Sequence, residues 1–93
     1  MLKSNSYFDG KVMSIAFQTE VLPATVGVME PGEYCFDTSQ KETITVVSGA
    51  LEVQLPDDNQ WQTYLPNDTF VVSANKSFHL KVATATAYLC TYE

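Results

Sequence analysis

The stretch Phe36–Leu55, FDTSQKETITVVSGALEVQL, has the pattern of two strands joined by a tight turn. Apolar and β-branched residues alternate with polar ones from Thr43 to Val47 and again from Leu51 to Leu55. This period-two pattern is typical of half-buried strands. Ser48 and Gly49 separate the two runs, and glycine supplies the positive φ that a tight hairpin turn requires. The stretch therefore predicts a β-hairpin.

The same alternation continues on both sides of this hairpin. Turn residues interrupt it at Pro31-Gly32, at Pro56–Gln60 and at Pro66–Asp68. No window carries the apolar spacing of an amphipathic helix, and no linker or repeat divides the chain. We expect one all-β domain over residues 1–93, in the form of a barrel or two-sheet roll. The further predicted strands are Lys11–Phe17, Thr25–Met29, Glu33–Thr38, Trp61–Leu65, Thr69–Val72, Phe78–Val82 and Ala85–Tyr92.

The composition narrows the classes of partner. Hydrophobic residues make up 45% of the chain and charged residues 17%, which is typical of a globular protein. Five Lys, no Arg and eleven acidic residues give a net charge of −6. A negative field repels phosphate backbones and anionic lipid headgroups. The charge therefore argues against binding to nucleic acid or to a membrane surface.

The apolar runs and the cysteines indicate the cellular compartment in which the protein is expected. The chain has no apolar run of signal-peptide length, and none approaches the eighteen or more apolar residues of a membrane span. Cys35 and Cys90 lack CxxC spacing and lie in apolar strand-like segments, so we expect two buried, reduced thiols. We expect a cytoplasmic protein.

The opening stretch also resembles the first motif of the cupin family, a double-stranded β-helix with a jelly-roll-like barrel. In that motif His-x-His is followed after three or four residues by Glu, and after six more by Gly. Counting back from Gly49 places Glu42 at the Glu position, with Thr38 and Phe36 where the two histidines would stand. Of the metal-ligand positions of this motif, only the one at Glu42 keeps its usual residue type.

The second cupin motif brings a histidine soon after a turn, and FVVSANKSFHLKV is the corresponding stretch here. Strict spacing falls on Phe78, one residue before His79. A transition-metal site needs three or four N, O or S ligands, and one carboxylate with one displaced imidazole falls short. We therefore predict no metal.

The orientation of His79 stays open at this point. If Phe78, Leu80 and Val82 face the core, then His79 and Lys81 face outward, because a one-residue slip reverses the face. A bulge in the turn at SANKS would instead bring His79 inward.

Several fragments, taken in order, carry a closer resemblance. SYFDGKVMSIAF, GEYCFDT, ETITVVSGALEVQLP, FHLKV and AYLCTYE together resemble the small single-domain cupins of the pyrimidine/purine nucleoside phosphorylase family, from Leu2 to Tyr92. The resemblance implies a metal-free, cofactor-free homodimer that cleaves nucleosides with inorganic phosphate as co-substrate. It also implies a broad range: uridine, thymidine, adenosine, guanosine, inosine, cytidine and xanthosine, each giving free base and a (deoxy)ribose 1-phosphate.

Two residues are the candidates for catalysis. Glu42 could bind ribose hydroxyls or stabilise the cationic sugar of an oxocarbenium-like state; otherwise it is a solvated carboxylate beside Lys41. His79 could protonate the base or contact phosphate, because its unperturbed pKa lies near neutrality, provided that its strand turns it inward.

The candidates for substrate binding are aromatic rings and hydroxyls. Aromatic side chains can stack a flat base without reading its edge, or simply fill the core. Hydroxyls could hold phosphate, with Lys76 or Lys81 as a point charge. The alternative function is a cupin that binds a small ligand without cleaving it. The candidate residues are Tyr34, Phe36, Tyr88 and Tyr92 for the base, and Thr38 and Thr45 for phosphate.

Overall fold

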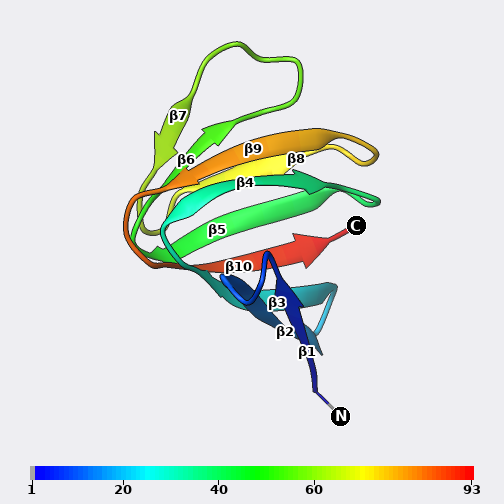
Figure 1. The fold of residues 1–93 in the computed structure, drawn as a ribbon. Coiled ribbons are helices and arrows are strands. Elements are labelled where there is room, and N and C mark those ends of the chain that lie inside the picture. The colour runs from blue at the N-terminus through cyan, green and yellow to red at the C-terminus, as the bar shows by residue number, and fades with distance from the viewer. Residues whose placement is uncertain (1) are drawn as a thin grey trace.

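A computed structural model describes residues 2–93, which form ten β-strands and no helix (Figure 1). The strands are β1 (Lys3–Tyr7), β2 (Val12–Gln18), β3 (Pro23–Met29), β4 (Gly32–Asp37), β5 (Glu42–Ser48), β6 (Leu51–Gln54), β7 (Gln62–Tyr64), β8 (Thr69–Val72), β9 (Ser77–Val82) and β10 (Thr86–Tyr92). All the predicted strands are present. β1 was not predicted, because KSNSY has no apolar alternation.

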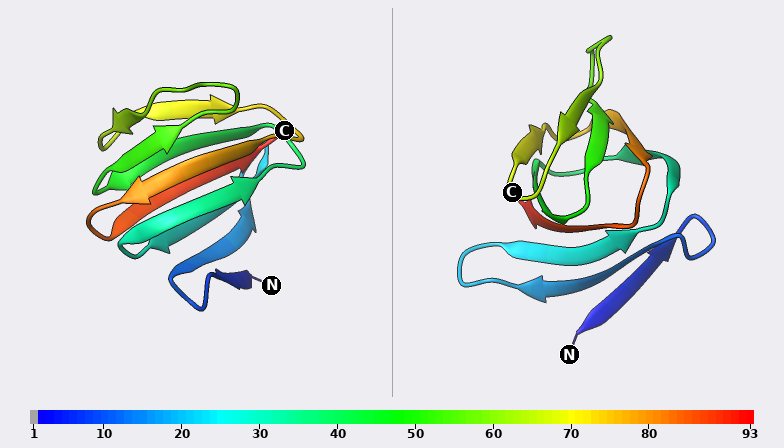
Figure 2. Two further views of the ribbon diagram at one scale, coloured as in Figure 1. Left: turned by 45° about the horizontal axis from the view of Figure 1, so that its top comes forward. Right: turned by 90° about the vertical axis from the view of Figure 1, so that its left-hand side faces the viewer.

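The strands form two antiparallel sheets. The larger sheet has the order β1-β2-β3-β10-β5-β8 and the smaller has the order β4-β9-β6-β7. In the right-hand panel of Figure 2 the strands around β10 close into a barrel-like ring, and β1–β3 lie as a layer beneath it. The predicted all-β barrel is therefore present, with the N-terminal strands extending one of its walls. Within residues 2–93 no helix is long and apolar enough to cross a membrane.

The predicted hairpin joins β5 to β6 through Ser48 and Gly49. Gly49 has φ +91°, and a Cβ at this position would collide with the Thr86 hydroxyl. Thr86 Oγ1 in turn donates to the carbonyl of Ala50 at 3.0 Å. Both the backbone angle and the lack of space therefore require glycine here.

The core lies between the two sheets. β9 alternates strictly, with Phe78, Leu80 and Val82 buried and the residues between them exposed. Other strands contribute their inward residues in the same way. The buried apolar cluster consists of Val12, Met29, Tyr34, Ile44, Val46, Leu51, Val53, Phe70, Val72, Phe78, Leu80, Val82, Tyr88 and Cys90.

The cysteines differ from the prediction in one respect. Both are free thiols, and Cys90 is buried, but Cys35 is exposed. Cys35 lies in β4 between Tyr34 and Phe36, which point toward the interior, so the strand turns its thiol outward. The prediction of two buried thiols is wrong for Cys35.

Candidate active site

A pocket of about 220 Å³ lies at one end of the barrel. Its lining includes residues where β4 and β10 end and β5 begins, and these strand ends lie near the C-terminus in Figure 1. Seven strands contribute to it, including β1, β2 and β3 of the N-terminal layer. Its lining consists of Tyr7, Ser14, Met29, Phe36, Asp37, Glu42, Ile44, Phe78, Tyr88, Cys90 and Tyr92.

Glu42 is the half-buried carboxylate of this pocket. It is the first residue of β5 and pairs in register with Tyr92, the last residue of β10. Burial raises the pKa of Glu42, and a hydrogen bond from Cys90 Sγ to Glu42 Oε1, 3.5 Å long, lowers it in part. The carboxyl group therefore titrates above its ordinary range.

Three acidic groups of β10 keep their protons at neutral pH. Burial raises the pKa of Tyr88 to about 12 and that of the Cys90 thiol to about 12, and it also raises the pKa of Tyr92. The Tyr92 hydroxyl lies 3.0 Å from the Thr25 hydroxyl, which holds the ring in place. The Glu42 carboxyl group therefore lies in a pocket with neutral side chains that can donate hydrogen bonds.

Aromatic rings form one side of the pocket. Phe36 and Phe78 are register partners on β4 and β9, and their rings stack at 5.9 Å between centroids with an interplanar angle of 28°. Tyr7 meets Phe36 edge-on at 6.3 Å. These rings come from strands far apart in the sequence, and they give a flat apolar surface beside Glu42.

The turn between β1 and β2 places Tyr7 at the pocket. Phe8, Asp9 and Gly10 all have positive φ, which reverses the chain sharply. The Phe8 ring then packs against Phe36 at 5.4 Å and against Tyr34 at 5.0 Å. This aromatic contact anchors the N-terminal hairpin to β4, and Tyr7 and Ser14 enter the lining from it.

Asp37 is a second carboxylate in the lining. It ends β4 and accepts a hydrogen bond from the Ser77 hydroxyl, its register partner on β9. Four lining residues were not predicted as site residues from the sequence: Tyr7, Ser14, Asp37 and Cys90. The signal for Asp37 was its place beside Phe36 in the cupin-like motif.

The structure brings four of the predicted site residues together. Phe36, Glu42, Tyr88 and Tyr92 all line the pocket. Tyr34 is buried instead in the core, and its hydroxyl donates to the carbonyl of Glu30 at 2.6 Å.

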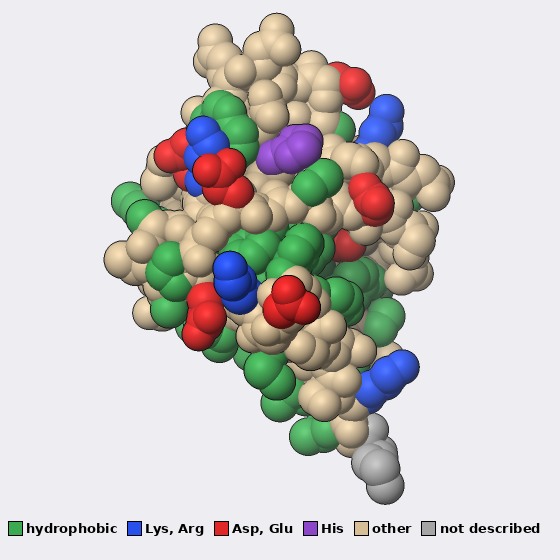
Figure 3. Space-filling view, viewed as in Figure 1, with side chains coloured by type: hydrophobic (Ala, Val, Ile, Leu, Met, Phe, Trp, Pro, Cys, Tyr) green, Lys and Arg blue, Asp and Glu red, His purple; other side chains and the backbone are tan. Residues whose placement is uncertain are grey.

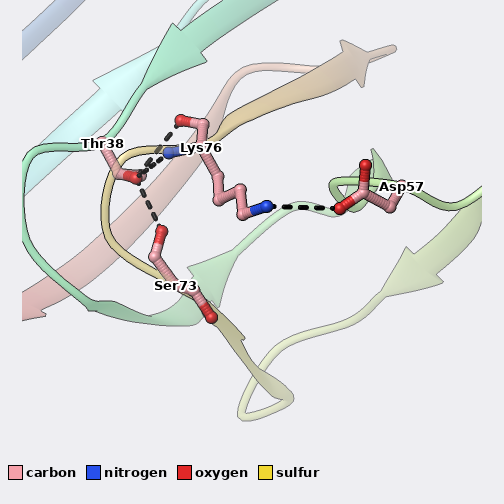
Figure 4. Close-up of polar contacts among 4 residues, drawn as sticks. All are labelled: Thr38, Asp57, Ser73 and Lys76. Carbon is pink, nitrogen blue, oxygen red and sulfur yellow. Dashed lines mark hydrogen bonds and ion pairs between the residues drawn. The ribbon is translucent and has the colours of Figure 1, made fainter.

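Thr38 lies outside the pocket lining, and its hydroxyl is hydrogen-bonded within a turn. Its hydroxyl donates to the carbonyl of Ser73 at 2.7 Å and accepts from the amide of Lys76 at 3.0 Å (Figure 4). The Lys76 ammonium reaches away from Thr38 to Asp57, at 3.4 Å. Thr38 therefore fixes the SANKS turn, and its hydroxyl is already hydrogen-bonded to backbone groups of that turn.

Thr45 and His79 lie on outer faces of the barrel. Thr45 alternates with the buried Ile44 and Val46, and its hydroxyl lies 2.9 Å from that of Thr69. His79 is exposed between the buried Phe78 and Leu80. The single histidine of the chain is visible at the surface in Figure 3. The structure therefore does not bring His79 to the pocket of Glu42, because β9 pairs regularly with β4 and His79 stays on the outward face of the strand.

Among residues 2–93 no group of three or more His, Cys, Asp or Glu side chains is arranged to hold a metal ion.

Comparisons with known proteins agree on the family. The family model described as pyrimidine/purine nucleoside phosphorylase matches residues 2–92. A pyrimidine/purine nucleoside phosphorylase of Magnetococcus marinus is 65% identical over 92 residues, covering 99% of both chains. A crystal structure of a protein of unknown function from Vibrio parahaemolyticus, 47% identical, superimposes with a TM-score of 0.96 and covers 100% of this chain and 99% of that one.

A more distant structure supports the fold alone. An RmlC-like cupin from Shewanella frigidimarina is 18% identical and has a TM-score of 0.75, covering 94% of this chain and 79% of that one. The two-sheet barrel is accordingly a cupin fold. With the match over residues 2–92, the chain belongs to the pyrimidine/purine nucleoside phosphorylase family.

Proposed function

We propose that this chain catalyses the phosphorolysis of nucleosides in the pocket around Glu42. The bond from C1′ of the sugar to the base nitrogen breaks, a bond from C1′ to an oxygen of hydrogen phosphate forms, and the proton of the phosphate ends on the departing base. The products are free base and (deoxy)ribose 1-phosphate. The observation that carries the proposal is a half-buried carboxyl group beside stacked aromatic rings, in a member of this family.

Each part of the pocket fits one need of this reaction. The ionised Glu42 would face the sugar and stabilise the positive charge that develops at C1′. Phe36 and Tyr7 offer ring faces and edges to the base without reading its hydrogen-bonding pattern. This mode of binding supports a wide range of bases: uridine, thymidine, adenosine, guanosine, inosine, cytidine and xanthosine.

Phosphate would be held by neutral donors. Ser14, Tyr88 and Tyr92 carry hydroxyls in the lining. Three lysines lie in ion pairs on the surface, Lys41 with Glu93, Lys76 with Asp57 and Lys81 with Glu52. Because neutral hydrogen bonds are weaker than charge-assisted ones, we expect a high KM for phosphate.

The reaction as proposed uses phosphate as co-substrate and no other cofactor. The two free cysteines fit a reducing compartment, which supports the cytoplasm as the place of the reaction.

The experiment follows the release of base from uridine and inosine by the pure protein, with and without phosphate and with a chelator. We expect release that depends on phosphate, yields sugar 1-phosphate and is unaffected by the chelator. Absence of phosphate-dependent release from every nucleoside of the proposed range would overturn the proposal. Saturable binding of nucleosides without turnover would then favour the ligand-binding alternative.

A further inference from the structure

Cys35 and His79 lie opposite each other on the outer face of the four-stranded sheet. They are register partners on β4 and β9, and both side chains are exposed. Neither of them lines the pocket of Glu42, so the phosphorolysis proposed above uses neither. A thiol beside an imidazole is nonetheless a reactive combination, because the imidazole can take up the thiol proton.

The type of strand pairing brings these two side chains close together. The amide of Thr38 donates to the carbonyl of Lys76, which is the residue opposite in the same register, so these two form a hydrogen-bonded pair. Hydrogen-bonded and non-hydrogen-bonded pairs alternate along an antiparallel ladder. Three positions earlier on β4, Cys35 and His79 therefore form a non-hydrogen-bonded pair, in which the Cα atoms lie only about 4.5 Å apart.

The neighbouring pair of the same kind shows that such side chains meet here. Asp37 and Ser77 are opposite each other two residues further along β4, on the same outward face. The Ser77 hydroxyl donates a hydrogen bond to the Asp37 carboxylate. The thiol of Cys35 and the imidazole of His79 have the same relation across the two strands, and they are long enough to come into contact in the same way.

A pocket of about 270 Å³ includes both side chains in its lining. Gln54, the register partner of His79 on β6, continues the row and also lines it. Trp61 forms a further wall, and the Lys81 ammonium lies 4.2 Å from the centre of its ring. Figure 3 shows the histidine on this open surface. The thiol therefore has room beside it for a small molecule, with an amide and an aromatic ring to contact it.

The charges around the pair are mainly negative. Glu33 and Asp37 flank the thiol on β4, and Glu33 also lines the pocket. Lys81 on β9 lies 4.0 Å from the carboxylate of Glu52 on β6, which offsets its charge. The whole chain has a net charge of −6. Such a field attracts a small molecule that carries a positive charge and repels an anionic one.

We propose that Cys35 exchanges with small disulfides that carry a cationic group, with His79 as the base that accepts the thiol proton. The thiolate attacks one sulfur of the disulfide, the bond between the two sulfurs breaks, and a mixed disulfide with Cys35 forms. The departing thiolate takes the proton from the imidazolium. The small disulfide is itself the oxidant, and an added thiol reverses the step. The modification is independent of phosphorolysis, because it takes place on the opposite face of β4 and β9 from the Phe36 and Phe78 rings.

The test follows the formation of the mixed disulfide with cystamine by mass spectrometry of the intact protein. We expect one adduct on the wild type, none on Cys35→Ser, and at least tenfold slower formation in His79→Ala at neutral pH. Thr63→Ala is the matched control, since Thr63 is exposed on β7 of the same sheet, and it should react like the wild type. Cys90 is buried, so a second adduct would reveal any variant that is unfolded.

The pH dependence of the rate separates the base from a merely structural neighbour. The wild type should keep its reactivity to lower pH than His79→Ala, because the imidazole accepts the proton that the thiol must lose. Equal rates in His79→Ala and the wild type at every pH would overturn the role of the histidine. Absence of an adduct on Cys35 of the wild type would overturn the proposal as a whole.

A second measurement uses the wild type alone and tests the preference for a cationic disulfide. Added salt screens the negative field around Cys35. It should therefore slow the reaction with cystamine, which is cationic, and speed the reaction with oxidised glutathione, which is anionic. A salt effect of the same sign on both reactions would contradict the preference.

Discussion

The thiol of Cys90 donates a hydrogen bond to Glu42 Oε1 on the inner face of the sheet, where β10 and β5 pair. Burial raises the pKa of the thiol to about 12, so at neutral pH it is a donor and never a thiolate. This bond opposes the effect of burial on the Glu42 carboxyl group. Cys90 therefore acts on the pocket as a positioning residue.

Cys90→Ala should move the acid limb of the activity profile to higher pH. Without the thiol, burial raises the pKa of Glu42 unopposed, so the ionised form is lost at a higher pH. Cys90→Ser keeps a donor and should remain close to the wild type. Measuring kcat/KM against pH in the three proteins checks this, and a limb that does not move in Cys90→Ala would remove the thiol from any role in tuning Glu42.

Glu42→Gln should lose at least tenfold in kcat/KM, about 1.4 kcal/mol of transition-state stabilisation, because an amide cannot balance the charge that develops on the sugar. The variant should also be more stable than the wild type at neutral pH. The folded-state pKa of Glu42 is raised, so the folded chain binds protons more readily and wild-type stability falls as pH rises through that pKa.

Urea unfolding at several pH values measures this second effect. The stability gap between Glu42→Gln and the wild type should close as pH falls below 4.5, the ordinary value for Glu, where both the folded and the unfolded chain are protonated. A gap that stays constant with pH would show that the ionisation of Glu42 carries no cost in the folded protein.

Thr38→Val should destabilise the protein by about 1–3 kcal/mol, because the backbone groups of Ser73 and Lys76 lose their hydrogen-bond partner. Its kcat and its KM for phosphate should not change in protein that remains folded. Thr38→Ser keeps the hydroxyl and should restore most of the stability. Thermal unfolding measures the role of Thr38 in the turn, and steady-state kinetics measure any role in binding phosphate. If the Thr38 hydroxyl bound phosphate, Thr38→Val would raise the KM for phosphate.

His79→Ala should leave turnover unchanged. The side chain lies on the outer face of β9, whereas Phe78 lines the pocket from the inner face of the same strand. Steady-state kinetics with uridine and inosine provide the check, with Glu42→Ala as the variant that should lose activity under the same conditions. Loss of tenfold or more in His79→Ala would return the histidine to the site.

The strand pattern was predictable because alternation, β-branched residues and turn chemistry agreed along most of the chain. The hairpin through Gly49 followed from this local information. Alternation in β9 also predicted the outward position of His79, which was one of the two orientations considered. β2 did not follow the usual rule, since its larger apolar residues, Met13, Ile15 and Phe17, face outward while Ser14 faces the pocket. Periodicity alone does not tell which face of a strand is covered.

The pocket was predictable only in part, because its lining converges from seven strands. Phe36 and Glu42 were found through the spacing of one local motif, which a sequence displays directly. Tyr7 and Ser14 reach the pocket through a sharp turn in a polar segment and through the pairing of β2 with β3. Long-range pairing of this kind leaves no mark on local spacing, and the place of Thr38 in the SANKS turn could not be predicted because its partners lie 35 and 38 residues further along.

Gly27→Ala should disturb the pocket by displacing the Tyr88 ring, which lines it. Gly27 pairs in register with Tyr88, and an added Cβ would lie 2.5 Å from the Tyr88 hydroxyl and 2.7 Å from a ring carbon. The ring would have to shift toward the pocket, so we expect a raised KM for nucleosides and a loss of about 1–3 kcal/mol in stability. A double-mutant cycle with Tyr88→Ala isolates the cause, because the cost of Gly27→Ala should largely vanish once the ring is gone. An equal cost in both backgrounds would place the effect in the β3 backbone instead of in the Tyr88 ring.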